Sequence, residues 1–238
     1  MNIEINKNYP YLYETHLHTS EGSACGRSTA AQMAVACKEA GYTGIIVTDH
    51  FFGGNTAADR KLPWKEWVES FCKGYENAQK TGDEIGLQVF FGWEQSFCGT
   101  DFLIYGLDKE WLLHHPEIKD ATVEEQYQLV HANGGMVIHA HPFREAFYIP
   151  ETRLYPEYVD GVEGVNATHV QWNRGERKNS YDEKAQEYAC TYNLPQTAGS
   201  DVHSVDLPGG GMAFARKLIS IQDYIEAVRN QEGILLPQ

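Results

Sequence analysis

Short apolar runs alternate with longer stretches of helical periodicity along almost the whole chain. The runs have the length and composition of buried strands. The stretches between them space their apolar residues three or four positions apart, as amphipathic helices do. This alternation predicts βα units around a mainly parallel sheet. The predicted strands are residues 11–18, 44–48, 87–93, 101–106, 135–138, 161–165 and 195–198.

Capping residues and helix breakers mark the ends of the predicted helices. Ser28 is the expected N-cap of the first helix, which Gly41 ends. A proline in its first turn favours the second helix. Thr122 and Glu125 form a capping-box pattern, and Ser220 is the expected cap of the last helix. The predicted helices span residues 29–40, 63–79, 122–133 and 220–230.

The predicted strands are numerous enough to close a barrel. No linker, low-complexity stretch or internal repeat divides the chain, so we expect one domain over residues 1–238. Its least regular parts are residues 144–160 and the glycine run at 209–211. In βα barrels the functional site lies at the carboxyl ends of the strands. Polar residues that end an apolar strand are therefore the functional candidates.

The composition is that of an acidic globular protein. With 238 residues, 42% of them hydrophobic, the chain is long enough for one large core. A formal charge of -14 and the lack of any basic run argue against a nucleic-acid partner. The same charge is compatible with a small phosphorylated substrate, because bound cations create a local positive site.

The expected location is the cytoplasm. The sequence has no signal-peptide pattern and no window apolar enough to span a bilayer, so we expect a soluble protein without a membrane partner. Five scattered cysteines without a CxxC pair favour a reducing compartment. Cys25 is near a candidate site, and a structural role is expected for it.

Histidines gather at the ends of predicted strands. Residues i and i+2 of a strand point to the same face with Cα atoms roughly 7 Å apart, so two such imidazoles can reach one cation at about 2 Å. A single pair is more often a structural or surface feature. Three pairs at strand ends instead predict a site for zinc, iron or manganese. The pairs are His16 with His18, His139 with His141, and Asp201 with His203.

Two further polar residues end apolar strands. Glu94 is the expected carboxylate bridge between two ions, because an unpaired charge has little reason to end such a strand. His50 is a candidate ligand, with Asp49 or a backbone carbonyl orienting its ring. The alternative is that Asp49 caps a helix and His50 is a core histidine.

Taken in order, these segments resemble the polymerase and histidinol phosphatase (PHP) family of metal-dependent phosphoesterases. The resemblance extends over residues 11–205 and is specific as a set. It implies an α/β fold, a distorted TIM-like (β/α)7 barrel of the PHP type, with two or three divalent ions (Zn, Fe or Mn) that hydrolyse phosphate esters. The matching segments are residues 14–19, 48–50, 92–94, 139–142 and 199–203.

The resemblance also implies how the ligands are shared among the ions. Asp101 stands where many members have a histidine, and Glu21 lies in the loop that often supplies an Asp or His to the third ion. Both are predicted as ligands. The implied sets are His16, His18, Glu94 and Asp201 for the first ion, Glu94 with His141 for the second, and His50 with His203 for the third.

Phosphate binding requires positive groups besides the ions. Arg144 and Arg27 lie in loops on the expected active face, where they either bind phosphate oxygens or pair with surface carboxylates. Asn166 follows a predicted strand and is a further substrate-binding candidate. The remaining histidines have no strand-end context and are expected not to be ligands: His114, His115, His131 and His169.

The predicted reaction is hydrolysis of a small phosphomonoester by a hydroxide that bridges two ions, without a side-chain nucleophile. Glu94 and Asp201 are the expected catalytic ligands, and either His203 or a metal-bound water protonates the leaving group.

Two other functions are compatible with parts of the pattern. Amidohydrolases also begin with an HxH pair, but many bridge their metals with a carboxylated lysine, and no lysine here ends an apolar strand. A nuclease or polymerase-associated module is less consistent with the acidic chain, which has no basic groove.

Overall fold

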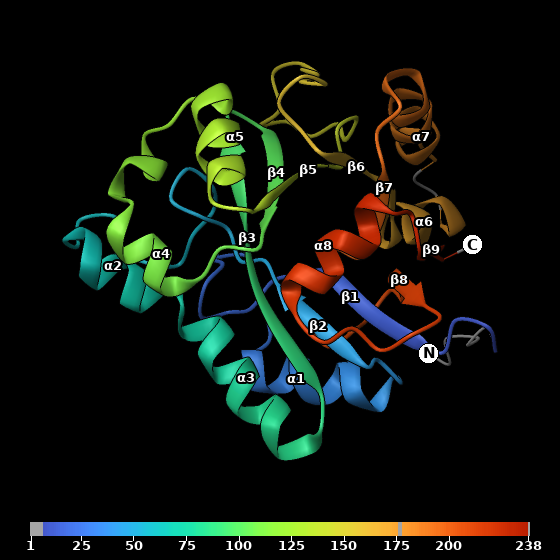
Figure 1. The fold of residues 1–238 in the computed structure, drawn as a ribbon, viewed down its shortest axis with the longest axis horizontal. Coiled ribbons are helices and arrows are strands. Elements are labelled where there is room, and N and C mark those ends of the chain that lie inside the picture. The colour runs from blue at the N-terminus through green and yellow to red at the C-terminus, as the bar shows by residue number, and fades with distance from the viewer. Residues whose placement is uncertain (1–6, 176–177, 238) are drawn as a thin grey trace.

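The computed structural model describes residues 7–175 and 178–237. The strands are β1 (Tyr11–Leu17), β2 (Gly44–Val47), β3 (Gln88–Phe97), β4 (Thr100–Tyr105), β5 (Met136–Ala140), β6 (Gly161–Asn166), β7 (Gln196–Gly199), β8 (Gly211–Phe214) and β9 (Ile234–Leu236). Within the described ranges they form one nine-stranded sheet in the order β7-β6-β5-β4-β3-β2-β1-β8-β9. The sheet curls into a nearly closed barrel with helices around it (Figure 1).

The carboxyl ends of β1 and β7 meet where the barrel closes. Leu17 pairs in parallel with Val202, and the His18 amide donates to the Val202 carbonyl at 2.9 Å. The Thr15 hydroxyl donates to the Ala198 carbonyl at 2.6 Å. The residues that follow these two strands, far apart in the sequence, therefore lie side by side.

The predicted TIM-like α/β barrel is confirmed, but the expectation of a mainly parallel sheet is wrong in its middle and at one edge. β4 runs antiparallel to both β3 and β5. The β3–β4 turn places Cys98 and Gly99 at φ 52° and 88°, the left-handed pair that a two-residue hairpin requires. β8 and β9 add antiparallel pairs beyond β1 and were not predicted, because the glycine run at 209–211 indicates a loop.

The helices include those predicted, with two corrections. They are α1 (Ala30–Glu39), α2 (Trp64–Phe71), α3 (Lys73–Ile85), α4 (Lys109–His114), α5 (Val123–Ala132), α6 (Ala167–Arg174), α7 (Tyr181–Tyr192) and α8 (Ile221–Arg229), with a 3-10 turn η1 (Pro116–Lys119). Thr29 rather than Ser28 caps α1, because Thr29 forms the capping box. The helix predicted over residues 63–79 is two helices that meet at Cys72. None of the described helices is long and apolar enough to cross a membrane.

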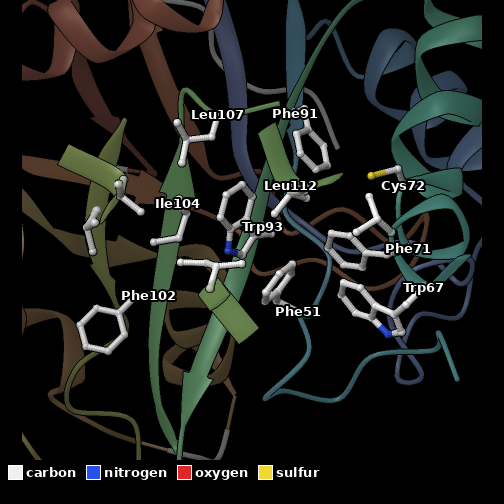
Figure 2. Close-up of a cluster of buried hydrophobic side chains, with 14 of the residues drawn as sticks. Phe51, Trp67, Phe71, Cys72, Phe91, Trp93, Phe102, Ile104, Leu107 and Leu112 are labelled. Atoms are coloured by element: carbon white, nitrogen blue, oxygen red, sulfur yellow. The ribbon is translucent and has the colours of Figure 1, made fainter. Parts of the chain in front are cut away.

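A cluster of buried aromatic rings packs beside β3 and β4 (Figure 2). Phe51 packs edge-on against Trp67 at 5.0 Å between ring centroids and lies 5.4 Å from Trp93. Trp93 precedes Glu94, and neighbouring residues of a strand point to opposite faces, so packing of Trp93 turns Glu94 away from the cluster. The amide of Phe51, which follows His50, donates to the Glu94 carbonyl at 2.8 Å. The core thereby fixes the backbone at two candidate ligands.

Candidate metal centre

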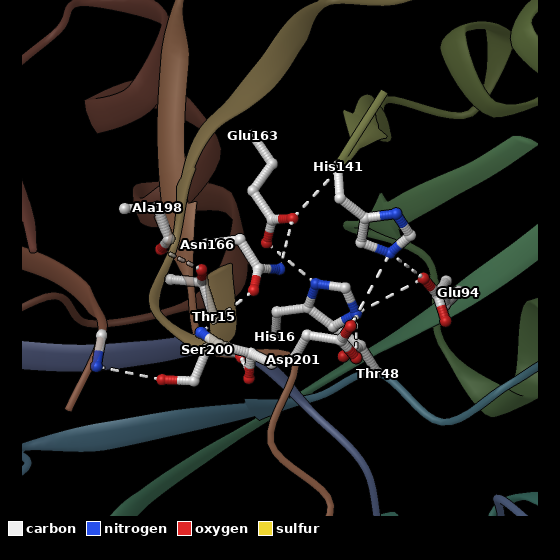
Figure 3. Close-up of polar contacts among 12 residues, drawn as sticks. Thr15, His16, Thr48, Glu94, His141, Glu163, Asn166, Ala198, Ser200 and Asp201 are labelled. Atoms are coloured by element: carbon white, nitrogen blue, oxygen red, sulfur yellow. Dashed lines mark hydrogen bonds and ion pairs between the residues drawn. The ribbon is translucent and has the colours of Figure 1, made fainter. Parts of the chain in front are cut away.

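Histidine and carboxylate side chains converge at the carboxyl ends of the barrel strands (Figure 3). Their ligand atoms form overlapping groups in which all atoms lie within 4.8 Å of one another. These groups contain the predicted ligands His16, His18, His50, Glu94, Asp101, His141 and His203, together with Glu163. Asp201 joins them, because its Oδ1 lies 3.0 Å from His18 Nε2.

Glu94 lies within the cluster, and its two oxygens face different imidazoles. Oε1 is 3.0 Å from His141 Nε2 and 3.4 Å from His16 Nε2. Oε2 is 2.6 Å from His50 Nδ1 and 3.6 Å from His18 Nε2. Ligands bonded to one ion at about 2 Å lie roughly 3 Å apart, so these gaps leave room for ions between Glu94 and the surrounding histidines. This spacing suits a bridging carboxylate.

Hydrogen bonds hold two histidine rings with one nitrogen directed into the cluster. His16 Nδ1 donates to Glu163 Oε1 at 2.8 Å. His18 Nδ1 lies 3.1 Å from the Ser23 hydroxyl, whose own proton goes to Asp49 at 2.7 Å, so His18 Nδ1 is the donor. In the neutral form of each ring, the Nε2 atom therefore presents a lone pair, as a metal ligand must.

Several buried atoms of the cluster have no hydrogen-bond partner among the residues that the structure describes. They are His16 Nε2, His18 Nε2, His50 Nδ1 and Glu94 Oε2; the last two approach each other without hydrogen-bond geometry. A buried polar atom without a partner costs about 1–3 kcal/mol. Divalent cations would satisfy these atoms, and imidazole with carboxylate is a donor set that suits zinc, iron or manganese. The residues present therefore fit the implied ions.

Two of the candidate ligands have a left-handed backbone. φ is 30° at His141 and 52° at Asp201. Non-glycine residues avoid this region, and such strain costs about 1–3 kcal/mol and is concentrated at functional sites. At His141 the left-handed residue follows the end of β5, and this turn directs its imidazole to Glu94.

Without a bound cation, protons balance the charges of the cluster. Burial alone would raise the pKa of Glu94, but the imidazoles of His50 and His16 hold it well below its ordinary value. Burial opposes ionisation of Asp201 as well, yet Arg144 and His16 hold its pKa well below the usual range. Desolvation would lower the pKa of His16, but the surrounding carboxylates raise it well above its ordinary value. A cation would replace these protons.

A cavity of about 480 Å³ opens onto the cluster. The predicted ligands Asp101, His141 and Asp201 line it, as does the predicted substrate-binding residue Arg144. Arg27 lines a separate recess that shares His203, Asp201 and Cys25 with the main cavity. The structure therefore places the two predicted arginines in different recesses beside the cluster.

Glu21 is not brought to the cluster. Its Oε2 accepts the Ala30 amide at 2.9 Å, at the start of α1, and its Oε1 accepts from Asn77 at 3.2 Å. A helix N-terminus attracts a carboxylate, which explains the correction.

Cys25 of the same loop lies beside His203 and His50. Hydrogen bonds with these two histidines outweigh burial and lower the pKa of the Cys25 thiol to about 6. Cys25 therefore lines the cavity beside two proposed ligands.

His139 is a core residue and not a ligand. Its ring is fully buried and stacks on Phe102 with 5.0 Å between centroids. Burial lowers its pKa to about 3, so the ring is neutral. The expected convergence of His139 with His141 fails because the backbone turns at His141.

Asn166 is buried and supports the cluster from behind. Its Nδ2 donates to Glu163 Oε2 at 3.0 Å, and its Oδ1 accepts the Thr168 amide at 3.2 Å and caps α6. Both ends of the amide are engaged, and Asn166 does not line the cavity. The expected contact with substrate is therefore not supported.

Glu163 and His169 are two polar residues near the site that sequence reasoning missed. Glu163 bonds to His16 and accepts the His141 amide at 3.1 Å. It stands within an apolar strand, the same signal that identified Glu94. His169 lies on α6 and accepts from Arg144 at 3.0 Å, a contact that no strand-end pattern indicates.

Comparison with known proteins places the fold. No family model and no curated protein matches the chain. Among solved structures, a two-domain protein from Bacteroides vulgatus containing a predicted PHP-like metal-dependent phosphoesterase is 14% identical with a TM-score of 0.66, over 99% of this chain and 68% of that one. PsfC from Pseudomonas syringae is 17% identical with a TM-score of 0.60, over 90% and 87% of the two chains.

An amidohydrolase from Chromobacterium violaceum, with bound sulfate and no metal, is also similar. It is 14% identical with a TM-score of 0.54, over 94% of this chain and 97% of that one. At these identities the likeness establishes the fold. The chain has the TIM-like barrel fold of PHP-like metal-dependent phosphoesterases.

Proposed function

We propose that this protein is a metal-dependent phosphoesterase that hydrolyses a small phosphomonoester. The observation that carries the proposal is Glu94, whose two oxygens face separate histidine pairs across gaps that suit shared cations. When bound, divalent ions supply Lewis acidity and lower the pKa of coordinated water. The chain's own residues supply the remaining steps.

The proposed ligand sets follow the distances. His16 and His18 converge with Asp201 and Glu94, and their ring centroids are 5.1 Å apart. His141 and Asp101 form a second group with Glu94. The third proposed group is His50 with His203, both of which lie beside the His18 ring.

The cavity also offers a cationic group for the phosphate. Arg144 reaches Asp201 with Nη1 and lines the cavity beside His141. A guanidinium group matches the geometry of phosphate oxygens and stays charged at every physiological pH. In a chain of net charge -14, cations and Arg144 together create the local positive field that a phosphate dianion needs.

The leaving group requires a proton donor, and His203 is the proposed candidate among the protein groups. Its Nδ1 donates to the Asp201 carbonyl at 2.9 Å, and it lines the cavity with a side chain that is 26% exposed. It is therefore accessible to a substrate, and it would act as the acid when its ring does not hold the third ion.

The proposal is tested by elemental analysis combined with a phosphate-release screen over alkyl, aryl and nucleoside monophosphates. The wild-type protein should bind Zn, Fe or Mn and release phosphate from at least one class. Glu94→Gln should lower metal occupancy and abolish turnover, whereas the exposed Glu110→Gln should match the wild type. Near-normal turnover in Glu94→Gln would reject this scheme.

An amide hydrolase is the second candidate, favoured by the Chromobacterium violaceum structure. The cavity lining contains no lysine among the described residues, and Glu94 would supply the bridging carboxylate. These features support the phosphoesterase. Hydrolysis of amides or lactones, without release of phosphate from any ester, would favour the second candidate.

A further inference from the structure

Arg144 is held from several sides at the edge of the cavity. Its Nε donates to His169 Nε2 at 3.0 Å, and its Nη1 forms an ion pair with Asp201. Its guanidinium carbon lies 5.7 Å from the centre of the Trp172 ring. The side chain is 11% exposed. Arginine is seldom buried unless it is paired, and here the pairing fixes the orientation of the guanidinium group.

The contact with Arg144 fixes the protonation of His169. A guanidinium nitrogen can only donate, so His169 Nε2 must carry a lone pair. The proton of the neutral ring is then on Nδ1, which donates to Asp182 Oδ1 at 2.7 Å. Arg144 therefore donates to His169, and His169 donates to Asp182, so all hydrogen bonds of this network run in one direction.

The three residues come from different parts of the fold. Asp182 is in the first turn of α7, His169 is on the buried face of α6, and Arg144 follows β5. Of the three, Arg144 lines the cavity. These hydrogen bonds thus link α6 and α7 to one guanidinium group beside the candidate ligands.

One end of Arg144 has no hydrogen-bond partner among the described residues. This end is Nη2, which is buried. A buried guanidinium N–H without an acceptor is costly, so an acceptor from outside the chain would stabilise it. Because Arg144 sits beside Asp201 and His141, such an acceptor would lie next to the candidate metal centre.

His139 shows that burial of a histidine does not by itself produce this arrangement. It is as fully buried as His169, yet neither of its ring nitrogens has a hydrogen-bond partner in the described part of the chain. His169 instead uses both nitrogens, each with a charged residue.

We propose that His169 and Asp182 are positioning residues that hold Arg144 so that its Nη2 binds one oxygen of a tetrahedral oxyanion, the phosphoryl group of the substrate. The proposal deepens and rests on the proposed phosphoesterase function. His169 acts through Arg144 and does not touch the substrate. Its loss should therefore weaken phosphate binding without removing metal.

The experiment uses the metal-loaded protein with inorganic phosphate as the probe. His169→Leu removes the acceptor for Arg144, His169→Gln retains one, and His139→Leu is the control for removing a buried histidine. We expect His169→Leu to weaken phosphate binding in calorimetry about tenfold, the value for loss of one charge-assisted hydrogen bond. Metal content should stay at the wild-type level, and His169→Gln and His139→Leu should bind phosphate within about threefold of it.

A second measurement reports on the positioning directly and needs no phosphate. The Arg144 Nε–H signal, assigned with Arg144→Lys, should exchange slowly in nitrogen-15 NMR spectra of the wild type and of His169→Gln. The signal should exchange rapidly in His169→Leu, and its protection from exchange should be weaker than wild type in Asp182→Asn.

The outcomes separate this inference from the proposed function. Unchanged phosphate affinity in His169→Leu, or an Arg144 signal indifferent to His169, would overturn the positioning role. Loss of metal in His169→Leu would also overturn it, since the effect would then be on the ligands. Phosphate binding that depends on His169, in a protein that hydrolyses no phosphate ester, would support the anion site and reject the phosphoesterase.

Discussion

Glu163 Oε1 accepts the Nδ1 proton of His16 at 2.8 Å, and both side chains are buried. The other oxygen of Glu163 accepts the His141 amide and Asn166 Nδ2. One carboxylate therefore orients the ring of one candidate ligand and the backbone of another. A carboxylate behind a ligating histidine fixes its tautomer and strengthens it as a ligand.

Replacement of this carboxylate should weaken metal binding without removing any ligand. In Glu163→Gln the NH2 group of the new amide must face either His16 Nδ1 or the donors on the other side, and all of these groups already donate a proton. We expect metal affinity to fall about 10- to 100-fold, the range for such supporting residues. Competition with a fluorescent chelator measures this. Glu110→Gln is the exposed control, and an affinity equal to wild type in Glu163→Gln would show that the contact has no role in binding.

The contribution of His16 to the stability of the chelator-treated protein should fall as pH rises. The folded-state pKa of His16 is raised above its ordinary value of 6.5, and that of His50 is raised as well. A group with a raised pKa stabilises the fold fully below its unfolded pKa and loses that effect as pH rises through the folded pKa. The contribution of His16 is therefore complete below about pH 6.5 and disappears at alkaline pH.

Thermal unfolding with and without metal measures this. In chelator, the difference in Tm between wild type and His16→Gln should narrow from pH 6 to alkaline pH. Added metal should raise the wild-type Tm most at alkaline pH, because the imidazoles are deprotonated there. A difference that widens with pH in chelator would contradict the raised pKa.

Local sequence signals predicted most of the fold. Strand runs and the capping box at Thr122 depend on neighbouring residues, and both appear where expected. The direction of β4 was not accessible in this way, because a two-residue hairpin at Cys98 and Gly99 lacks the usual Asn-Gly signal. β8 is short and glycine-flanked, and it forms only because β1 offers it an edge.

The candidate site was predictable where a ligand ends or lies in an apolar strand, as Glu94 does. It was not predictable where the role depends on a helix from elsewhere. Glu21 has the right residue type but is captured by the start of α1. His169 looks like an ordinary helical residue until α6 is packed beside Arg144.

The thiol of Cys25 should react at unusually low pH. Despite burial, hydrogen bonds from His203 and His50 lower its pKa to about 6, from an ordinary value of 9.0. In chelator-treated protein, alkylation of Cys25 by iodoacetamide should therefore reach half its maximal rate near pH 6, as followed by peptide mass spectrometry. Cys72, whose pKa burial raises to about 12, is the internal control and should stay unmodified. A midpoint near pH 9 for Cys25 would contradict the contact.

Removal of the Phe51 ring should destabilise the protein and disturb the metal centre together. Phe51 is fully buried against Trp67 and Trp93, and a phenylalanine-to-alanine change in such a core costs about 3–5 kcal/mol of unfolding free energy. Because Phe51 follows His50 and its amide holds the Glu94 carbonyl, the cavity left by Phe51→Ala lets both ligands move. The free energy of unfolding in urea and the metal content should both fall.

Phe147→Ala is the matched control, since that ring is fully exposed. It should change the free energy of unfolding by less than about 0.5 kcal/mol. Full metal occupancy in a strongly destabilised Phe51→Ala would show that the aromatic cluster stabilises the barrel without positioning its ligands.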